Sequence, residues 1–242
     1  MIIMIRSALF FISFIIGIIF FGLLIVLVWP VTSLHIRQHL SVVWSRFNAH
    51  ILRLVSGLDL EVHGMENLPP RPYLIVAKHQ SAWETVIFPV IFYKCTWVLK
   101  QSLGMIPVFG WALKGTGQIF VDRSRGIDAV RKMNSRGREI LQSGGVVVVF
   151  PEGTRVDPGV VGDYKSGGIS LAMSAKVPIV PVAHNAGEFW PRKTFRTKPG
   201  AVQVRIGKPL VTEGSNRRKL LAEAKVSIEA MMDEIEHSKS LS

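Results

Sequence analysis

A histidine and a glutamate stand five residues apart, directly after a run of apolar residues. The run 73–77 predicts a buried strand, and His79 and Glu84 follow it. Side chains five apart on one continuous helix point in different directions, but a histidine in a loop can reach a glutamate in the next helical turn. A carboxylate that hydrogen-bonds one imidazole nitrogen leaves the other free to act as a general base. The spacing therefore indicates an acid–base pair of His79 and Glu84.

The same glutamate also has a purely structural interpretation. Ser81 and Glu84 have the spacing of a capping box, in which the glutamate accepts hydrogen bonds from N–H groups at the start of a helix. The spacing alone leaves both interpretations open.

Two further groups of polar residues follow predicted strands. After the apolar run 146–150 comes Pro151–Arg155, in which Gly153 permits close approach of the backbone and Arg155 has the planar fork that binds phosphate. Arg123 follows another short apolar run. Catalytic groups in open α/β sheets gather at the carboxyl ends of strands, so the positions favour function. Ordinary solvated arginines after strands remain the alternative.

Short apolar runs and helical patterns alternate from residue 60 onward and must position these groups. The apolar runs have no polar alternation, which is typical of strands whose sheet is covered by helices on both faces. The order of elements predicts an α/β fold. The predicted strands are 73–77, 96–99, 118–121, 146–150, 179–182 and 202–206, and the predicted helices are 82–92, 127–142, 168–175 and 215–236.

The N-terminal part of the chain differs from the rest. Residues 1–30 carry one charge, Arg6, and the uncharged segment Ser7–Val28 is long enough as a helix to cross a hydrocarbon core. Trp29 and Pro30 follow it in place of the small-residue cleavage site of a secretory signal, so we expect a retained membrane anchor. More positive charge follows this segment than precedes it, which predicts a cytosolic C-terminal domain.

Residues 34–56 have the apolar spacing of an amphipathic helix. Its apolar stripe consists of Ile36, Leu40, Val43, Trp44, Phe47, Ile51 and Leu54. The helix either packs on the domain or lies in the membrane interface with Arg37, Arg46 and Arg53 toward lipid phosphates. We therefore divide the chain into a membrane anchor with an amphipathic helix, residues 1–58, and an α/β domain, residues 59–242.

The net charge of +12 favours anionic partners, such as nucleic acid, an acidic membrane surface or phosphorylated substrates. Cys95 is the only cysteine, which excludes an intramolecular disulfide and a thiolate metal cluster. The six histidines other than His79, His184 among them, lack metal-ligand spacing, so we expect no metal and assign these residues structural roles.

Together, these polar groups resemble the motifs of the 1-acylglycerol-3-phosphate acyltransferase family of membrane enzymes. The segment from His79 to Glu84 resembles the first motif, 117–123 the second, 150–155 the third and the proline-bearing run 177–182 the fourth. The first motif of the family usually ends in aspartate. Glu84 keeps the charge and adds one methylene, so the exact geometry of the pair differs.

The resemblance implies a mixed α/β sheet flanked by helices. It implies that His79, oriented by Glu84, takes the proton from the free hydroxyl of lysophosphatidic acid as that oxygen attacks an acyl thioester. The donor would be acyl-CoA or acyl-carrier protein, and no cofactor is implied. The residues implied to bind the substrate are Lys100, Arg123, Glu152, Gly153, Thr154 and Arg155, with the three cations at the phosphate.

Other functions remain open at this point. Another lyso-lipid, such as a lyso-ornithine lipid or a different lysophospholipid, could be the acceptor. A non-catalytic membrane protein that binds lipids is a second alternative, although a binding module has no need of a base. Nucleic-acid binding is suggested by charge alone, and the expected anchor argues against it. We expect a membrane protein, in a bacterial inner membrane, whose catalytic domain faces the cytosol.

Overall fold

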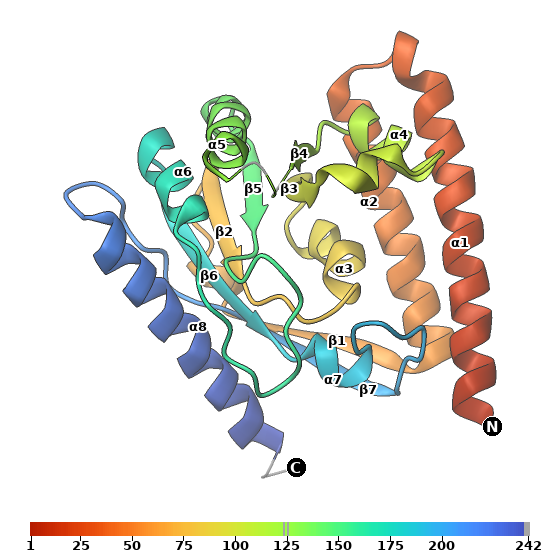
Figure 1. The fold of residues 1–242 in the computed structure, drawn as a ribbon. Helices are drawn as coiled ribbons and strands as arrows, with labels where there is room; N and C mark the ends of the chain where they lie inside the picture. The colour runs from red at the N-terminus through yellow and green to blue at the C-terminus, as the bar shows by residue number, and fades with distance from the viewer. Residues whose placement is uncertain (123, 125, 240–242) are drawn as a thin grey trace.

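The computed structural model describes residues 1–122, 124 and 126–239, which form a mixed sheet between layers of helices (Figure 1). The strands lie in the order β1-β7-β6-β2-β5-β3-β4. Among these residues, β6 and β7 pair antiparallel and the other neighbours pair parallel. The strands are β1 (Leu58–His63), β2 (Tyr73–Ala77), β3 (Cys95–Lys100), β4 (Ile119–Val121), β5 (Val146–Val149), β6 (Ile179–His184) and β7 (Gly200–Ile206). The predicted mixed α/β sheet is confirmed.

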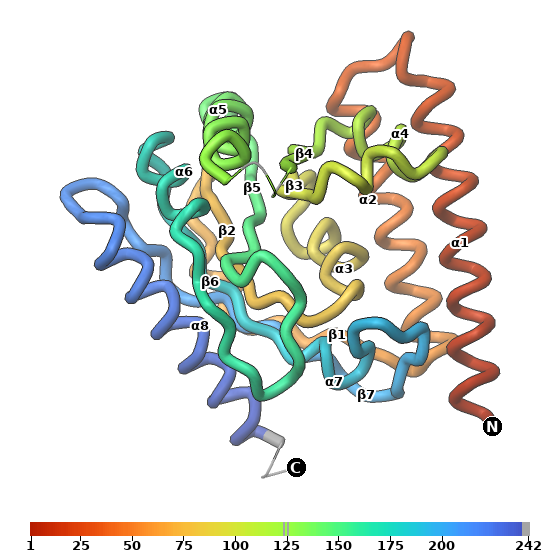
Figure 2. Tube along the Cα trace, viewed as in Figure 1, coloured from red at the N-terminus to blue at the C-terminus, as the bar shows by residue number. Residues whose placement is uncertain are grey.

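The helices form two layers, one on each face of the sheet. One layer contains α5, α6 and α8; on the opposite face α3 packs on the sheet, and α2 and α1 lie outside α3 (Figures 1 and 2). The helices are α1 (Ile2–Val28), α2 (Leu34–Ile51), α3 (Trp83–Ile91), α4 (Phe109–Gly115), α5 (Ile127–Gln142), α6 (Gly167–Ala175), α7 (Ala186–Phe189) and α8 (Arg217–Lys239). The predicted strands and helices are present, with bounds shifted by up to three residues.

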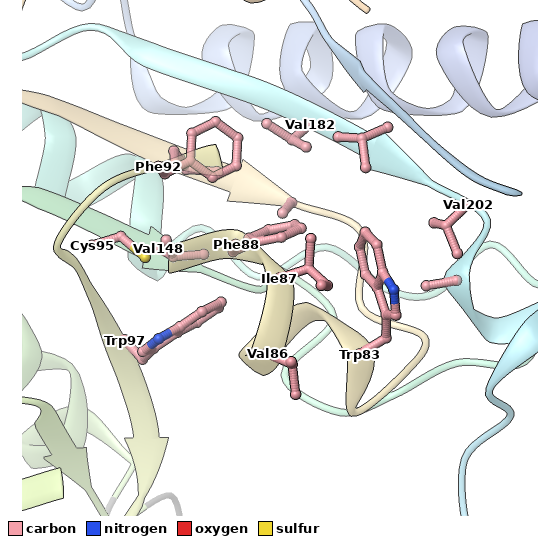
Figure 3. Packing of buried hydrophobic residues seen from close by; sticks show 14 of the residues in the cluster. Trp83, Val86, Ile87, Phe88, Phe92, Cys95, Trp97, Val148, Val182 and Val202 are labelled. Atoms are coloured by element: carbon pink, nitrogen blue, oxygen red, sulfur yellow. The ribbon is translucent and has the colours of Figure 1, made fainter. Parts of the chain in front are cut away.

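Alternate residues of β2 enter two separate hydrophobic clusters. Tyr73 and Ile75 pack with α3, whereas Leu74 and Val76 pack with α6 and α8 on the other face. Figure 3 shows the first cluster, in which the side chains of α3 meet those of the central strands. Because both faces are covered, every position of β2 is apolar, as the uninterrupted apolar run predicted.

Helix α1 has one packed side and is otherwise apolar and exposed. Its buried residues include Phe10, whose ring meets Trp190 edge-on at 5.3 Å, and Gly22, against which the Val108 side chain lies closely. Phe10 belongs to the same cluster as β2 and α3. By length and composition, α1 is able to cross a membrane. The division of the chain at residue 58 stays a prediction.

Helix α2 packs between α1 and α3, but through a different face from the expected one. The apolar Val43 and Phe47 of the predicted stripe are exposed, whereas Arg37, Ser45 and Asn48 are buried. Thus the helix does pack on the domain, and its apolar stripe is divided: Trp44 and Ile51 pack against the core, whereas Val43 and Phe47 face outward.

The guanidinium of Arg37 is enclosed by backbone carbonyls. It donates to the carbonyl of Gly115 at 2.7 Å and to those of Trp29 and Thr32. The expectation that Arg37 faces lipid phosphates is therefore wrong, because the side chain fastens α2 to the end of α4.

Candidate active site

The first and third polar groups emerge side by side because β2 and β5 are neighbouring parallel strands. Val76 lies opposite Val149, so both strands end at the same edge of the sheet. The loops that follow are joined by a hydrogen bond of 2.9 Å from the N–H of Val156 to the carbonyl of His79. The rule that parallel strands collect functional groups at their carboxyl ends placed these segments correctly.

The structure brings His79 and Glu84 into contact. Nδ1 of His79 lies 2.5 Å from Oε2 of Glu84. The glutamate side chain, in the first turn of α3, is fully buried, and the histidine side chain is 14% exposed. Since an ionised carboxylate only accepts hydrogen bonds, the proton of neutral His79 lies on Nδ1. The expected contact exists, and its catalytic role stays a prediction.

Glu84 also serves the start of α3. Its Oε1 atom accepts the backbone N–H groups of Gln80 at 2.7 Å and Ser81 at 2.6 Å. Glu84 therefore makes both the contact with His79 and the hydrogen bonds at the helix start, one set for each oxygen. Burial would raise the pKa of the Glu84 carboxyl. The imidazoles of His79 and His184 and the N–H of Gln80 outweigh burial and keep this pKa below its usual value.

The ring of His79 is held in one plane with its other nitrogen accessible. Phe150 stacks on it with 3.9 Å between ring centroids and 9° between planes. Among the described residues, Nε2 of His79 has no hydrogen-bond partner. An imidazole fixed through Nδ1, with a free lone pair on Nε2, can accept a proton from a hydroxyl group.

Glu152 belongs to the loop that follows β5, and its carboxyl group contacts the loop of His79. The residue is 5% exposed, and its Oε1 accepts the backbone N–H of His79 at 3.4 Å. Burial raises the pKa of the Glu152 carboxyl to about 7, although Lys78, 4.0 Å away, opposes this shift. Lys78 itself pairs at 2.9 Å with Glu229 of α8. The Glu152 carboxyl thus helps to hold the loop of His79 in place. A role of Glu152 in shaping an acceptor pocket stays a prediction.

The residues after Glu152 lie nearer the surface. Gly153 has φ +69°, a conformation that favours glycine, and Thr154 is exposed. Arg155 is half-buried, and its guanidinium makes no hydrogen bond or ion pair with the described part of the chain. Its carbonyl accepts a hydrogen bond of 2.8 Å from Arg192, which also grips Asp157 through two bonds of 2.8 Å.

The other two predicted phosphate ligands are less well defined. Lys100 ends β3 at the same edge of the sheet, where it is exposed and has no ionic partner in the described residues. Arg123 lies outside the described residues. The structure therefore brings together His79, Glu152, Gly153, Thr154 and Arg155 of two adjoining loops and Glu84 of the first turn of α3, with Lys100 on the next strand along.

A cavity of about 580 Å³ adjoins these loops. Phe150, whose ring stacks on His79, lines this cavity, as do Pro151 and Gly153. The rest of the lining is largely apolar and comes from the ends of β3, β4 and β5 and from α5 and α6. Among the residues that the structure describes, Lys165 and Arg217 are the cations in the lining. The cavity arises where α5 and α6 meet the sheet, which no local pattern reveals.

His184 is a second imidazole at Glu84. It ends β6, which neighbours β2, and its Nε2 lies 3.3 Å from Oε1 of Glu84. The side chain is fully buried, and this burial lowers its pKa. The sequence does contain a signal for it, because His184 follows an apolar strand just as His79 does. From the sequence, we expect a structural role for His184, because this residue lacks metal-ligand spacing to other side chains.

Neither Cys95 nor a metal-binding cluster forms part of the site among the described residues. Cys95 is buried in the cluster with α3, and burial raises the pKa of its thiol to about 12. Within residues 1–122, 124 and 126–239, no three His, Cys, Asp or Glu side chains are grouped as a metal ion would need.

The family model described as Acyltransferase matches residues 59–185. The 1-acyl-sn-glycerol-3-phosphate acyltransferase of Pseudomonas aeruginosa is 38% identical, over 95% of this chain and 90% of the relative. The Saccharomyces cerevisiae protein of the same name is 34% identical, over 76% of this chain and 62% of its own length. In structure, the chain is similar to the 1-acyl-sn-glycerophosphate (LPA) acyltransferase of Thermotoga maritima, with a TM-score of 0.81 and 22% identity over 96% of this chain and 95% of the other.

Proposed function

This chain belongs to the acyltransferase family, among the 1-acyl-sn-glycerol-3-phosphate acyltransferases, and we propose that it acylates lysophosphatidic acid to give phosphatidic acid. The donor in this proposal is a thioester, acyl-CoA or acyl-carrier protein, and the reaction uses no cofactor. The observation that carries it is the geometry of His79, whose Nδ1 is held by a buried carboxylate while Nε2 is free.

The proposed reaction is a single acyl transfer. Nε2 of His79 accepts the proton of the acceptor hydroxyl as the oxygen attacks the thioester carbonyl carbon. The carbon–sulfur bond then breaks, and the proton passes from His79 to the leaving thiolate. Glu84 stays ionised throughout and stabilises the imidazolium that forms in between.

The phosphate of the acceptor is the proposed ligand of Arg155, Arg123 and Lys100. The free guanidinium of Arg155 and the exposed ammonium of Lys100 support this role. Arg192 donates a hydrogen bond to the backbone carbonyl of Arg155. The backbone of Arg155 is therefore held in place while its side chain binds the ligand. Glu152, Gly153 and Thr154 complete the acceptor side of the site.

The cavity beside Phe150 is the proposed site for an acyl chain. Its lining is largely apolar, and it begins at the residue that stacks on His79. An acyl chain in this cavity would place a polar head near Lys165, Arg217 and the loop of Gly153.

The enzyme is proposed to work at a membrane. The exposed sides of α1 carry Ile12, Ile16, Phe20 and Leu27, which would meet lipid. The excess of positive charge after α1 favours a cytosolic catalytic domain, and we propose a bacterial inner membrane.

The test is an acyl-transfer assay of the purified full-length protein with labelled oleoyl-CoA and a panel of lyso-lipids. We expect lysophosphatidic acid to be the preferred acceptor and His79→Ala to be inactive with it. A lyso-ornithine lipid or another lysophospholipid used at least as well would reassign the acceptor. Binding without turnover of any acceptor would favour a lipid-binding protein.

A further inference from the structure

Glu84 lies between two imidazoles, of which the proposed mechanism uses only one. His79 approaches Oε2, and His184 approaches Oε1 from the end of the neighbouring strand. The two histidines differ in burial, since His79 reaches the surface and His184 has no exposed area. A buried imidazole beside a catalytic carboxylate is a group whose contribution can be worked out from its contacts.

The contacts of His184 fix which nitrogen carries its proton. The backbone N–H of Ala186 donates to Nδ1 at 3.2 Å, so Nδ1 has a lone pair and the proton is on Nε2. Nε2 lies 2.9 Å from the carbonyl of Lys78 and 3.3 Å from Oε1 of Glu84. The N–H therefore donates to the carbonyl of Lys78, the residue before His79, and its dipole lies close to the carboxylate that holds His79.

The surroundings keep His184 neutral. Desolvation lowers its pKa, and the nearby cationic Lys78 and the imidazole of His79 act in the same direction. Glu84 and the carbonyl of Lys78 act in the opposite direction, and the larger effect of burial outweighs them. The rings of Trp83 and Phe88 pack within 6 Å of the imidazole, at centroid distances of 5.9 and 5.7 Å. His184 therefore offers a fixed N–H dipole and no positive charge.

We propose that His184 is a positioning residue for acyl transfer, whose N–H holds the carbonyl of Lys78 beside His79 and whose N–H dipole stabilises the carboxylate of Glu84, so that Oε2 remains aligned with Nδ1 of His79. This inference rests on the proposed function of His79 as the base. The backbone N–H groups of Gln80 and Ser81 donate to Oε1, and Nε2 of His184 lies 3.3 Å from the same oxygen, while the short contact to His79 occupies Oε2.

Loss of the His184 N–H has a consequence that packing alone would not produce. The buried carboxylate would lose a nearby N–H dipole that favours its ionised form, so the His79–Glu84 pair would retain its proton to higher pH. The base would then become available only at higher pH. The acid limb of kcat against pH should move upward, while the affinity for the acceptor should remain the same.

Two substitutions of similar polarity separate the donor from the bulk of the ring. In His184→Gln the amide nitrogen can reach the position of Nε2 and donate to Glu84 and Lys78. In His184→Asn the shorter amide reaches only the position of Nδ1, where its oxygen can accept from Ala186. Thermal unfolding of both full-length variants accompanies the kinetics.

For His184→Asn we expect kcat at pH 7 to fall about tenfold and the acid limb to move up by about one pH unit, because an N–H dipole beside a buried charge is lost. For His184→Gln we expect the wild-type limb and a kcat within about threefold of the wild type, because the donor is restored. The KM for lysophosphatidic acid should change in neither variant.

An unchanged acid limb in His184→Asn would overturn the inference, as would a Gln variant whose limb moves as far as that of the Asn variant. His79→Ala, assayed in parallel, tests the proposed function separately. If His79→Ala is inactive and the two His184 variants have identical limbs, only the positioning role fails. If His79→Ala retains activity, the assignment of the base itself fails.

Discussion

The two sides of the site are built in opposite ways. On the side of the base, Glu84 is fully buried, and both of its oxygens receive hydrogen bonds from the protein. On the side of the cations, Lys100 is exposed and the guanidinium of Arg155 has no partner in the described residues. The groups proposed to move a proton are thus held by hydrogen bonds, whereas Lys100 and Arg155, which are proposed to bind phosphate, are paired with no carboxylate among the described residues.

This difference has a physical reason. Proton transfer requires a fixed tautomer and a distance near that of a hydrogen bond, and an error of about 1 Å can cost about a hundredfold in rate. A phosphate group needs cations that are not already neutralised by carboxylates. Substitutions on the side of the base should therefore lower kcat, and those on the side of the cations should raise the KM for the acceptor.

The largest effect is expected from removal of the base. His79→Ala should lower kcat by about 10²- to 10⁴-fold, because no other side chain can accept the proton at that position. The unfolding temperature and membrane binding should change little, and the exposed His63→Ala serves as the matched control. Activity above a few per cent of wild type would show that another group takes the proton.

Glu84→Gln should be almost as severe. The amide oxygen would keep the N–H groups of Gln80 and Ser81, so the amide NH₂ would face His79. Nδ1 would then have to accept a hydrogen bond, which moves the imidazole proton to Nε2 and blocks the base. We expect a loss of kcat of about 10²-fold or more. Measured kcat within tenfold of wild type would show that the tautomer is not controlled by this residue.

Glu84→Asp keeps the charge and shortens the side chain by one methylene. We expect a loss of kcat of about tenfold, because the carboxylate recedes from a contact that is now 2.5 Å long. A kcat equal to that of the wild type would show that the backbone of α3 adjusts freely to aspartate.

On the opposite side, Arg155→Ala should raise the KM for lysophosphatidic acid by about ten- to a hundred-and-fifty-fold, the usual range for a charge-assisted contact. Arg155→Lys should recover part of this, since an ammonium lacks the planar fork. The KM of the acyl donor is the internal control and should change much less. If the KM of the donor rises in place of that of the acceptor, Arg155 binds the carrier.

The smallest effect concerns Glu152, whose buried carboxyl group joins the loop after β5 to the loop of His79. Its raised pKa of about 7 means that the folded protein binds this proton more tightly than the unfolded chain. Stability should therefore fall as the pH rises from the ordinary carboxyl range to about 7. Glu152→Gln cannot ionise, so it should gain on the wild type by on the order of 2 kcal/mol between pH 5 and pH 8. Thermal unfolding curves with parallel pH dependence would contradict this.

Local patterns predicted the half of the site that depends on local geometry. The loop of His79 and the first turn of α3 are adjacent in the chain, so spacing alone could place Glu84 within reach of His79. The loop of Arg155 could also be placed, because β5 is an unbroken apolar strand. His184 lies a hundred residues after Glu84, and only the pairing of β6 with β2 brings the two together.

In α2, the amphipathic pattern of the sequence does not predict which side of the helix is buried. Amphipathic patterns predict burial of the apolar side when the surroundings are water. The buried side of α2 instead carries Arg37, Ser45 and Asn48, and Phe47 is exposed. A lipid environment, which we propose for α1, would favour this inverted arrangement.

Three short elements have no sequence pattern long enough to identify them, namely β1, α4 and α7. Contacts with distant parts of the chain define them: β1 and α7 contact β7, and α4 contacts α1.

The most direct test of the division between the two sides is a cycle that removes the phosphate from the substrate and the guanidinium from the protein. Initial rates with lysophosphatidic acid and with monoacylglycerol are measured for the wild type, Arg155→Ala and His79→Ala. We expect Arg155→Ala to lose about ten- to a hundred-and-fifty-fold in kcat/KM with lysophosphatidic acid and almost nothing further with monoacylglycerol. His79→Ala should lose the same factor with both acceptors. Equal losses by Arg155→Ala with the two acceptors would contradict the assignment of Arg155 to phosphate and, with it, the separation of binding from proton transfer.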